Sequence, residues 1–209
     1  MATSKRVSKE QERKRRLILE AAKRLFAKEG FDNVSMRRIA AEADYSPAAI
    51  YRYFRSKREI LSHLRNQGFA EFSSNRAYLE ESLSPEELLR EAGRSYIRFA
   101  MNNPDDFHLM FCTSCREVDL EGELAGASLE SYRRFRSMVG RVVESGYFGD
   151  ADEEAVAFGL WAGVQGLASL ITSGRAQIFS ESDVDDLMER VLRFLRRPAG
   201  TGDRSQGKR

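Results

Sequence analysis

The stretch from Ser35 to Phe54 constrains this chain most, because it reads as two short helices joined by a tight turn. A serine at Ser35 can cap the first helix, and apolar residues follow at spacings that place them on one helical face. The pattern breaks at Asp44. Ser46 and Pro47 then restart a helix with a hydroxyl cap and a proline in the first turn, where no hydrogen bond is lost. We therefore predict a helical hairpin here.

The second helix of this hairpin has two contrasting faces. Ile50 and Phe54 lie four residues apart and would face back onto the first helix, whereas Ala48 and Tyr51 are left on the outer face. Small residues at the leading end permit close approach to another surface, and the phenol behind them can reach a phosphate. Such a surface fits the major groove of DNA.

The same stretch resembles the DNA-binding segment of the TetR family of bacterial transcriptional regulators. The residues that match the family pattern are Arg37, Ile39, Ala40, Ala43, Ser46, Ile50, Tyr51, Tyr53, Phe54, Lys57 and Ile60. Asp44 and Tyr45 depart from it, where glycine and valine are usual, but aspartate tolerates the left-handed conformation and the turn should form. The resemblance implies an all-α fold of about nine helices. An N-terminal three-helix DNA-binding domain with a helix-turn-helix would precede a C-terminal helical domain that binds an effector and dimerises.

The resemblance and side-chain chemistry together assign the DNA-binding residues. We expect contacts from Ser35, Arg37, Ser46, Pro47, Ala48, Ala49, Tyr51, Tyr53 and Lys57. Arg37 is the candidate for a bidentate contact with guanine, whereas the tyrosines and Lys57 would bind phosphates. The proline and alanines offer only apolar contact to thymine methyl groups. Specificity would then depend on Arg37, on dimer spacing and on DNA shape.

Charge is divided unevenly along the 209 residues. Residues 1–65 contain 17 Lys and Arg against 8 Asp and Glu, whereas the remainder contains 17 against 24. A basic head followed by an acidic body predicts an N-terminal unit that binds a polyanion. The first residues lack the apolar core of a signal peptide, and 2 cysteines do not make a disulfide scaffold. We expect a cytoplasmic protein.

Four regions are predicted along the chain. They are a disordered basic arm at 1–8, the DNA-binding domain at 9–55, an effector-binding and dimerisation domain at 56–197, and a disordered tail at 198–209. Ser56 and Glu59 have the spacing of a capping box and open a long fourth helix. This helix would belong to both domains and could couple them.

The last two predicted helices, at 153–173 and 182–197, indicate a homodimer. The first is apolar on nearly all sides and the second is strongly amphipathic, so one chain would cover them poorly. We expect a four-helix interface between two copies. Its residues would be Leu160, Val164, Leu167, Val184, Leu187, Met188 and Val191. The alternative is that these helices complete the core of a monomer.

The C-terminal half also resembles the WHG-type subgroup of TetR effector domains, through Asn103-Pro104 and a later Trp161 with Gln165. Gln165 replaces the histidine that gives the subgroup its name. The candidate pocket walls are Phe72, Tyr96, Phe99, Phe107, Met110, Phe111, Phe135, Trp161 and Gln165. Their aromatic, sparsely charged character favours a small apolar or aromatic effector, although aromatic stripes also make ordinary cores.

A second constellation comprises His108, Cys112 and Cys115, spaced i, i+4 and i+7. These residues could bind zinc or copper, or the thiols could respond to oxidants. Cysteines among large apolar residues are, however, commonly small core residues, and no fourth ligand is evident. We predict no cofactor and no resident metal. Neither His63 nor His108 lies in a catalytic motif, so we also predict that the chain is not an enzyme.

The sequence therefore predicts a dimeric TetR-like transcriptional regulator, in most such proteins a repressor, released from a palindromic DNA operator by a small-molecule effector. Two alternatives stay open. One is a metal- or thiol-responsive sensor that uses Cys112 and Cys115 on the same DNA-binding scaffold. The other is a helical protein-interaction module without DNA activity.

Overall fold

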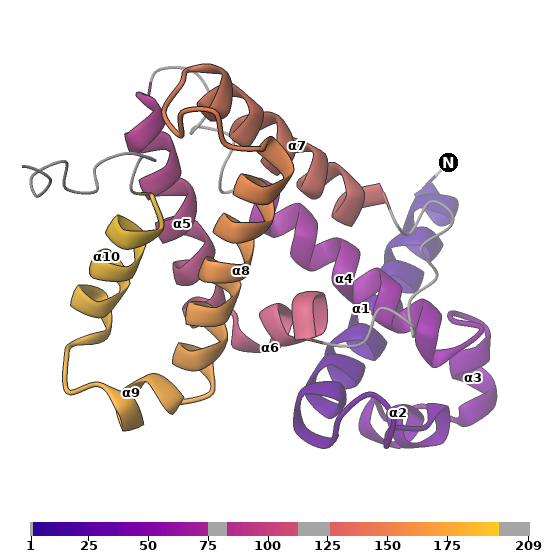
Figure 1. Cartoon of the computed structure of the whole chain (residues 1–209). Helices are drawn as coiled ribbons and strands as arrows, with labels where there is room; N and C mark the ends of the chain where they lie inside the picture. Colours follow the sequence, from indigo (N-terminus) through magenta and orange to yellow (C-terminus); the bar gives the residue numbers. More distant parts are fainter. Residues whose placement is uncertain (1, 75–82, 113–125, 197–209) are drawn as a thin grey trace, which may run out of the picture. The chain divides into compact units, whose positions relative to one another are not determined.

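The computed structural model describes residues 2–74, 83–112 and 126–196, and these residues form an all-helical protein (Figure 1). The elements are α1 (Ala2–Glu29), α2 (Met36–Glu42), α3 (Pro47–Tyr51), α4 (Lys57–Ser74), α5 (Pro85–Asn102), α6 (Pro104–Phe107), the π-helical turn η2 (His108–Cys112), α7 (Gly126–Glu144), α8 (Glu153–Thr172), α9 (Arg175–Phe179) and α10 (Val184–Leu195). The predicted all-α class is confirmed.

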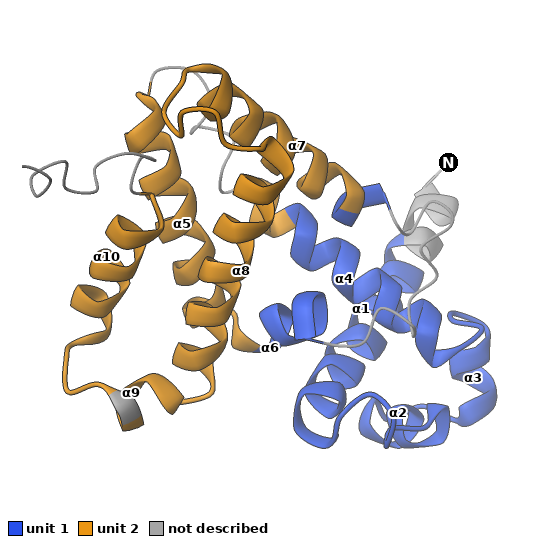
Figure 2. Ribbon diagram, in the orientation of Figure 1, with its two compact units in different colours: residues 1–70, 105–128 blue, residues 71–104, 129–209 orange. Residues whose placement is uncertain are grey.

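The chain divides into two compact units (Figure 2). Unit 1 comprises Met1–Ala70 and Asp105–Ser128, and unit 2 comprises Glu71–Pro104 and Leu129–Arg209. The units do not coincide with the domains predicted at 9–55 and 56–197. The difference arises because most of α4 and the whole α6–η2 segment pack with the N-terminal helices.

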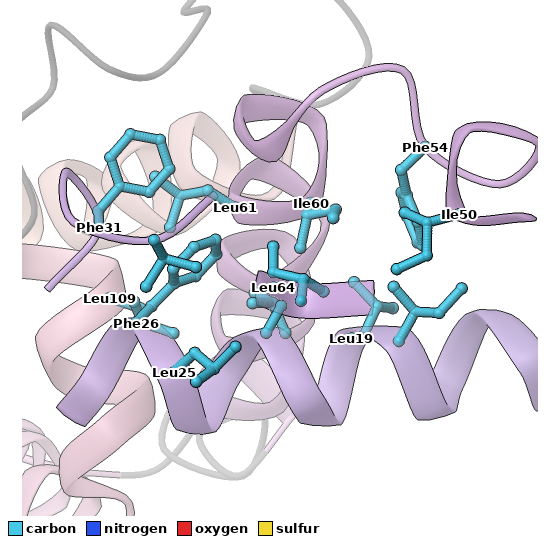
Figure 3. Close-up of a cluster of buried hydrophobic side chains, with 14 of the residues drawn as sticks. Leu19, Leu25, Phe26, Phe31, Ile50, Phe54, Ile60, Leu61, Leu64 and Leu109 are labelled. Atoms are coloured by element: carbon cyan, nitrogen blue, oxygen red, sulfur yellow. The ribbon is translucent and has the colours of Figure 1, made fainter. Parts of the chain in front are cut away.

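The core of unit 1 contains an apolar cluster to which the N-terminal helices, the turn after α1, α4 and η2 contribute (Figure 3). Its large members, all nearly inaccessible to solvent, include Ile18, Leu25 and Phe26 of α1, Phe31 of the turn, Ile39 of α2, Ile50 and Phe54 of the α3 region, Ile60, Leu61 and Leu64 of α4, and Leu109 of η2. Leu109 is far from the others in sequence. Its burial explains why η2 belongs to unit 1.

Helix α1 begins at Ala2, so it includes residues 2–8 of the stretch predicted as a disordered arm. The reason is local: the sequence offers no glycine or proline before Gly30, and Glu10 forms ion pairs with Arg13 and Lys14 on the same helix. Gly30 ends the helix with a φ of +80°, a left-handed conformation that suits glycine. The predicted tail at 198–209 lies outside the described residues.

Unit 2 is built around α5, α7, α8 and α10. One apolar cluster joins Leu88, Leu89 and Ala92 of α5, Met138, Val139 and Val142 of α7, Phe148, and Ala157 of α8. Two glycines let α10 approach its neighbours closely, because a Cβ at Gly93 would collide with Leu192 and one at Gly163 would collide with Leu195. Helices α8 and α10 therefore lie side by side, joined by the short α9 (Figure 1).

Helix α8 is the one helix among the described residues that is long and apolar enough to cross a membrane by length and composition alone. Here it packs against α5 and α10. Core helices of soluble proteins pass the same test of length and composition, so this property does not define a membrane span.

Candidate nucleic-acid interface

Both helices of the hairpin begin with the predicted serine caps. The Ser35 Oγ accepts a hydrogen bond from the backbone N–H of Arg38 at 3.2 Å. The Ser46 Oγ accepts one from the N–H of Ala49, also at 3.2 Å, and Pro47 occupies the first turn of α3. These caps satisfy backbone donors that a short helix otherwise leaves open, and so they fix where each helix starts.

The turn between α2 and α3 is a left-handed helix ending. Asp44 has a φ of +60°, which confirms that aspartate takes the place usually held by glycine. The N–H of Tyr45 donates to the carbonyl of Ala40 at 2.9 Å, and that of Asp44 donates to Ala41 at 3.4 Å. This pair of bonds is a Schellman motif. The ring of Tyr45 is partly buried against the core of unit 1, where it closes the turn.

The two faces of α2 and α3 differ as the spacing predicts. Ile39, Ala40 and Ile50 are at most 1% exposed and hold both helices against the core. Most of the predicted DNA-binding residues lie in solvent, and the exposed ones are Ser35, Arg37, Ser46, Pro47, Ala48 and Tyr51. Tyr51 is 55% exposed although its side chain is large and aromatic. Ala49 and Tyr53 are half-buried, Tyr53 against the core.

The adjacent arginines of α2 have different roles. Arg38 is held by two carboxylates, with Nη1 at 3.3 Å from Glu42 and Nη2 at 3.1 Å from Glu29. Arg37 is exposed and forms no hydrogen bond or ion pair within the described part of the chain. The guanidinium of Arg37 is therefore available to an external acceptor, whereas that of Arg38 stabilises the unit.

Lys57, predicted to bind phosphate, has partners inside unit 1. Its Nζ donates to the carbonyls of Phe31 at 2.8 Å and Asp32 at 3.2 Å, and it lies 4.4 Å from the centroid of the Phe31 ring. It fastens the start of α4 to the turn after α1. Sequence spacing could not reveal this contact, because it depends on how two distant segments meet.

Arg15 is a positioning residue that the sequence did not single out. Its guanidinium donates to the carbonyl of Tyr53 at 3.1 Å, lies 4.6 Å from the centre of the Phe54 ring and contacts Nε2 of His63 at 3.1 Å. Burial lowers the pKa of His63, the positive charge of Arg15 lowers it further, and Glu59 opposes the shift. The neutral imidazole can therefore accept from Arg15, so Arg15 ties α1 both to α4 and to the segment that follows α3.

The nine candidate pocket residues are divided between the two units. Unit 2 contains Phe72, Tyr96, Phe99, Phe135, Trp161 and Gln165, and unit 1 contains Phe107, Met110 and Phe111. The Phe72 ring lies 5.6 Å from that of Tyr96 and 5.1 Å from that of Phe99. The Tyr96 hydroxyl donates to Oε1 of Gln165, so this glutamine has a hydrogen-bonding role that needs no ionisable group. In unit 1, Phe107 and Met110 are buried.

Two of the residues predicted at the dimer interface face the core of unit 2 instead. Leu167 is 6% exposed and Met188 is 1% exposed, and Leu160 packs partly against the α5–α7–α8 cluster. The other four, Val164, Val184, Leu187 and Val191, are half-buried. Amphipathic spacing predicts burial but not whether the covering surface comes from the same chain. Leu167 and Met188 are thus removed from the interface prediction.

A different face of α8 is open, and we call it the α8 outer face. Its residues are Ala155, Phe158, Gly159, Ala162, Gly166 and Leu170, all exposed and at helical spacing. Phe158 is 48% exposed and Leu170 is 43% exposed. Within the described residues, a Cβ built at Gly159 or Gly166 would meet nothing within 4 Å, whereas one at Gly163, on the adjoining side of the helix, would meet Leu195. Phe194 of α10 is also 66% exposed.

The structure gives little support to a metal or redox site at His108, Cys112 and Cys115. Within the described residues, no three His, Cys, Asp or Glu side chains are arranged to hold a metal ion, and Cys115 lies outside those residues. Cys112 is an exposed residue, but partial burial of its thiol raises the pKa, which disfavours the thiolate that metals and oxidants require. A sensor role for Cys112 is therefore not favoured.

A capped helix-turn-helix with a polar outer face, followed by a separate helical unit, defines a helix-turn-helix DNA-binding regulator. Comparison with known families makes this specific. Residues 18–64 match the family described as "Bacterial regulatory proteins, tetR family". Residues 89–195 match the family described as "Tetracyclin repressor-like, C-terminal domain". The chain belongs to the TetR family of DNA-binding transcriptional regulators.

Solved structures share this fold at low sequence identity. The TetR family transcriptional regulator PfmR from Thermus thermophilus is 20% identical, with a TM-score of 0.69 over 87% of this chain and 97% of its own. The fatty acid degradation regulator FadR from Bacillus halodurans is 18% identical, with a TM-score of 0.64 over 91% and 97%. AibR, crystallised with isovaleryl coenzyme A and operator DNA, is 19% identical, with a TM-score of 0.68 over 88% and 99%.

Proposed function

We propose that this regulator is a homodimeric repressor that binds a palindromic operator and leaves it when a small organic effector binds. The observation that carries the proposal is the outer face of α2 and α3, where Arg37 and Tyr51 are exposed on a rigid, capped scaffold. Two copies would place α3 in successive major grooves, about one helical turn apart. Such a protein acts where the DNA is, in the cytoplasm, and by binding rather than catalysis.

The exposed residues divide into base-reading and phosphate-binding groups. Arg37 has a free guanidinium that can donate twice to a guanine edge. Pro47 and Ala48 can contact thymine methyl groups at the leading end of α3. The Tyr51 hydroxyl can donate to a phosphate. The hydroxyls of Ser35 and Ser46 accept from their own helices and still have a proton to donate.

Dimerisation would use the α8 outer face. A row of small residues flanked by Phe158 and Leu170 lets a second helix approach closely and buries apolar area that is open in the single chain. An isologous pair of such faces makes a closed dimer. The two DNA-binding surfaces would then be held at a fixed spacing, which a palindrome requires.

Effector binding would be coupled to DNA through α4 and η2. Helix α4 begins against the DNA-binding hairpin and contributes Phe72 to the aromatic cluster with Tyr96 and Phe99. An effector that bound against α4 would shift this helix and so change the spacing of the two heads. Effector and operator would then oppose each other by one coupling free energy. The aromatic lining supports an apolar or aromatic effector, and the fatty acid and acyl-coenzyme A chemistry of FadR and AibR agrees with an apolar group.

Footprinting on DNA that flanks the coding region tests the proposal. At fixed, near-physiological salt we expect a protected palindrome for the wild type and its loss for Tyr51→Ala. Glu71→Ala, an exposed substitution on α4 away from the hairpin, is the matched control and should leave protection intact. Protection that is equal in Tyr51→Ala and the wild type would contradict the assignment of this face to DNA.

A further inference from the structure

Arg65, in the middle of α4, is a buried cation with a side-chain nitrogen that has no hydrogen-bond partner among the described residues. The residue is 8% exposed, and its Nη1 atom is fully buried and forms no hydrogen bond. The next residue, Asn66, also has a buried polar atom without a hydrogen bond. This atom, the side-chain Oδ1, is an acceptor to which no group donates. These two are the only such side-chain atoms in the described part of the chain.

A second buried arginine shows how unusual this is. Arg196 is also 8% exposed, but its guanidinium donates to the carbonyl of Leu192 at 3.1 Å and lies 3.4 Å from the carboxylate of Glu86. Proteins normally pair a buried charge in this way, because removing it from water uncompensated is strongly unfavourable. The buried Nη1 of Arg65 is therefore a donor for which a ligand can supply the acceptor.

The surroundings of Arg65 fit an organic ligand. By helical spacing, Arg65 shares its face of α4 with Gly68 and Phe69, which meet η2. A Cβ at Gly68 would lie 2.6 Å from the sulfur of Met110, and the Phe69 and Phe111 rings are 5.3 Å apart. Besides Arg65 this face of α4 contains the buried Ser62, three residues earlier, and the other side chains named here are apolar or aromatic.

Asp106 of α6, which lies close to this face, already forms an ion pair with another residue. The Cβ of Asp106 lies 3.8 Å from a Cβ built at Gly68, but the Asp106 carboxylate pairs with Lys23 of α1. Asp106 is thus not available to pair with Arg65, because it pairs with Lys23 of the same unit.

We propose that Arg65 anchors an oxyanion of the effector, a carboxylate or a phosphate, and that Asn66 accepts a hydrogen bond from a donor beside that oxyanion. Arginine holds both oxyanions through two parallel N–H donors. The ligand class is an organic anion with an apolar body, from either of two sources, a free carboxylic acid or a phosphate-bearing thioester. This inference rests on the proposed function, because it names the chemistry of that effector.

The ligand-free protein provides the first test. Arg65→Met removes an uncompensated charge at similar volume, so we expect its melting temperature to equal or exceed that of the wild type. Arg98→Met, at an exposed position on α5, is the control and should change neither stability nor ligand response. A clear drop in the melting temperature of Arg65→Met would show that Arg65 is structural and would overturn the proposal.

The second test uses matched ligands. Phenylacetate and octanoate are compared with their primary amides, and with phenylacetyl- and octanoyl-coenzyme A, by thermal shift and by release from operator DNA. We expect at least one oxyanion series to act and the amides not to, with the concentration for half-release at least about thirtyfold higher in Arg65→Met. Response to the acids identifies a carboxylate, and response to the thioesters alone identifies a phosphate.

Four results would overturn the inference: amides as active as acids, an equal response in Arg65→Met, no response to any probe, or mandelate binding no more tightly than phenylacetate. The last result bears on Asn66, since mandelate adds one hydroxyl donor beside the carboxylate. Operator binding of the ligand-free wild type is measured in the same experiment. Its absence would instead count against the proposed function, so the two failures are distinguishable.

Discussion

The hairpin of α2 and α3 and the helix α8 both have one buried and one exposed face, but the exposed faces differ in chemistry. The hairpin buries Ile39 and Ile50 and presents Arg37 and Tyr51 to solvent. Helix α8 is apolar on both sides, and its outer face presents small and large apolar residues. A polar exposed face suits a charged polymer, whereas an exposed apolar face of this extent is typical of a protein interface.

The comparison also explains why the exposed face of the hairpin can be predicted from the sequence, whereas the exposed face of α8 cannot. The apolar residues of the hairpin pack within a single unit. Their spacing in the sequence therefore shows which face is buried and which is exposed. The sequence of a helix that is apolar on all sides does not indicate which neighbouring element covers each side. The structure alone separates Gly163, where a Cβ would meet Leu195, from Gly166, where a Cβ would meet no atom of the described residues within 4 Å.

The largest effect should come from breaking the inner face of the hairpin. Ile50 is fully buried, so Ile50→Ala should lower the free energy of unfolding by about 2–5 kcal/mol through lost burial and a residual cavity. The neighbouring Tyr51→Ala should change it by no more than about 0.5 kcal/mol, because Tyr51 is exposed. Urea denaturation measures both. Equal losses would mean that the two faces are not distinct.

The next effect should come from the α8 outer face. Gly166→Glu places a charge where a Cβ would meet nothing within 4 Å in the described part of the chain, so the fold should survive while the dimer dissociates. A monomer binds one half of the operator and loses the affinity that comes from binding both halves at once. Operator affinity should therefore fall by about a hundredfold. Sedimentation and DNA titration on the same samples test this. Glu154→Gln, an exposed change at the start of α8, serves as the control. A Gly166→Glu protein that is still dimeric would move the interface elsewhere.

A smaller effect is expected at the turn. Asp44 has a left-handed backbone that glycine adopts without strain, so Asp44→Gly should leave the turn intact and stabilise unit 1 by at most about 1 kcal/mol. Asp44→Val should destabilise it, because a branched side chain disfavours a positive φ. Thermal denaturation compares the three proteins, and a stabilising Asp44→Val would contradict the geometry.

The smallest effect should appear with pH. The pKa of His63 is lowered in the fold from its ordinary value of 6.5, so the unfolded chain binds this proton more tightly. Stability from this site is therefore complete above about pH 6.5 and declines as the pH falls below it. His63→Gln, which can still accept from Arg15, should remove this part of the pH dependence. Calorimetry between pH 5 and pH 8 measures it, and an unchanged profile in the variant would rule His63 out as the source.

In unit 2 the group that makes stability depend on pH is the carboxylate of Glu189. Arg94 donates to this carboxylate and lowers its pKa below the ordinary 4.5, so the stability that the pair contributes is lost as the pH falls through and below that value. The two units thus respond to acid in different ranges. Hydrogen exchange resolved by residue would assign each response to its unit.

The sequence predicts much of the fold and part of the site. Local chemistry is enough for the serine caps at 35 and 46, the left-handed Asp44 and the exposure of Arg37, because each depends on neighbours within a few residues. Contacts between distant segments are not accessible in this way. The ties made by Lys57 and Arg15, the entry of Leu109 into unit 1 and the burial of Leu167 and Met188 follow only from the assembled chain.

The account depends most on the claim that the outer face of α2 and α3 reads DNA, and the two adjacent arginines test it most directly. Operator and unrelated DNA are titrated with the wild type, Arg37→Ala and Arg38→Ala at one salt concentration. We predict that Arg37→Ala loses about 1–3 kcal/mol of operator binding and much less on unrelated DNA, whereas Arg38→Ala stays within about twofold of the wild type. Equal losses on both DNAs for Arg37→Ala, or a larger loss for Arg38→Ala, would contradict it.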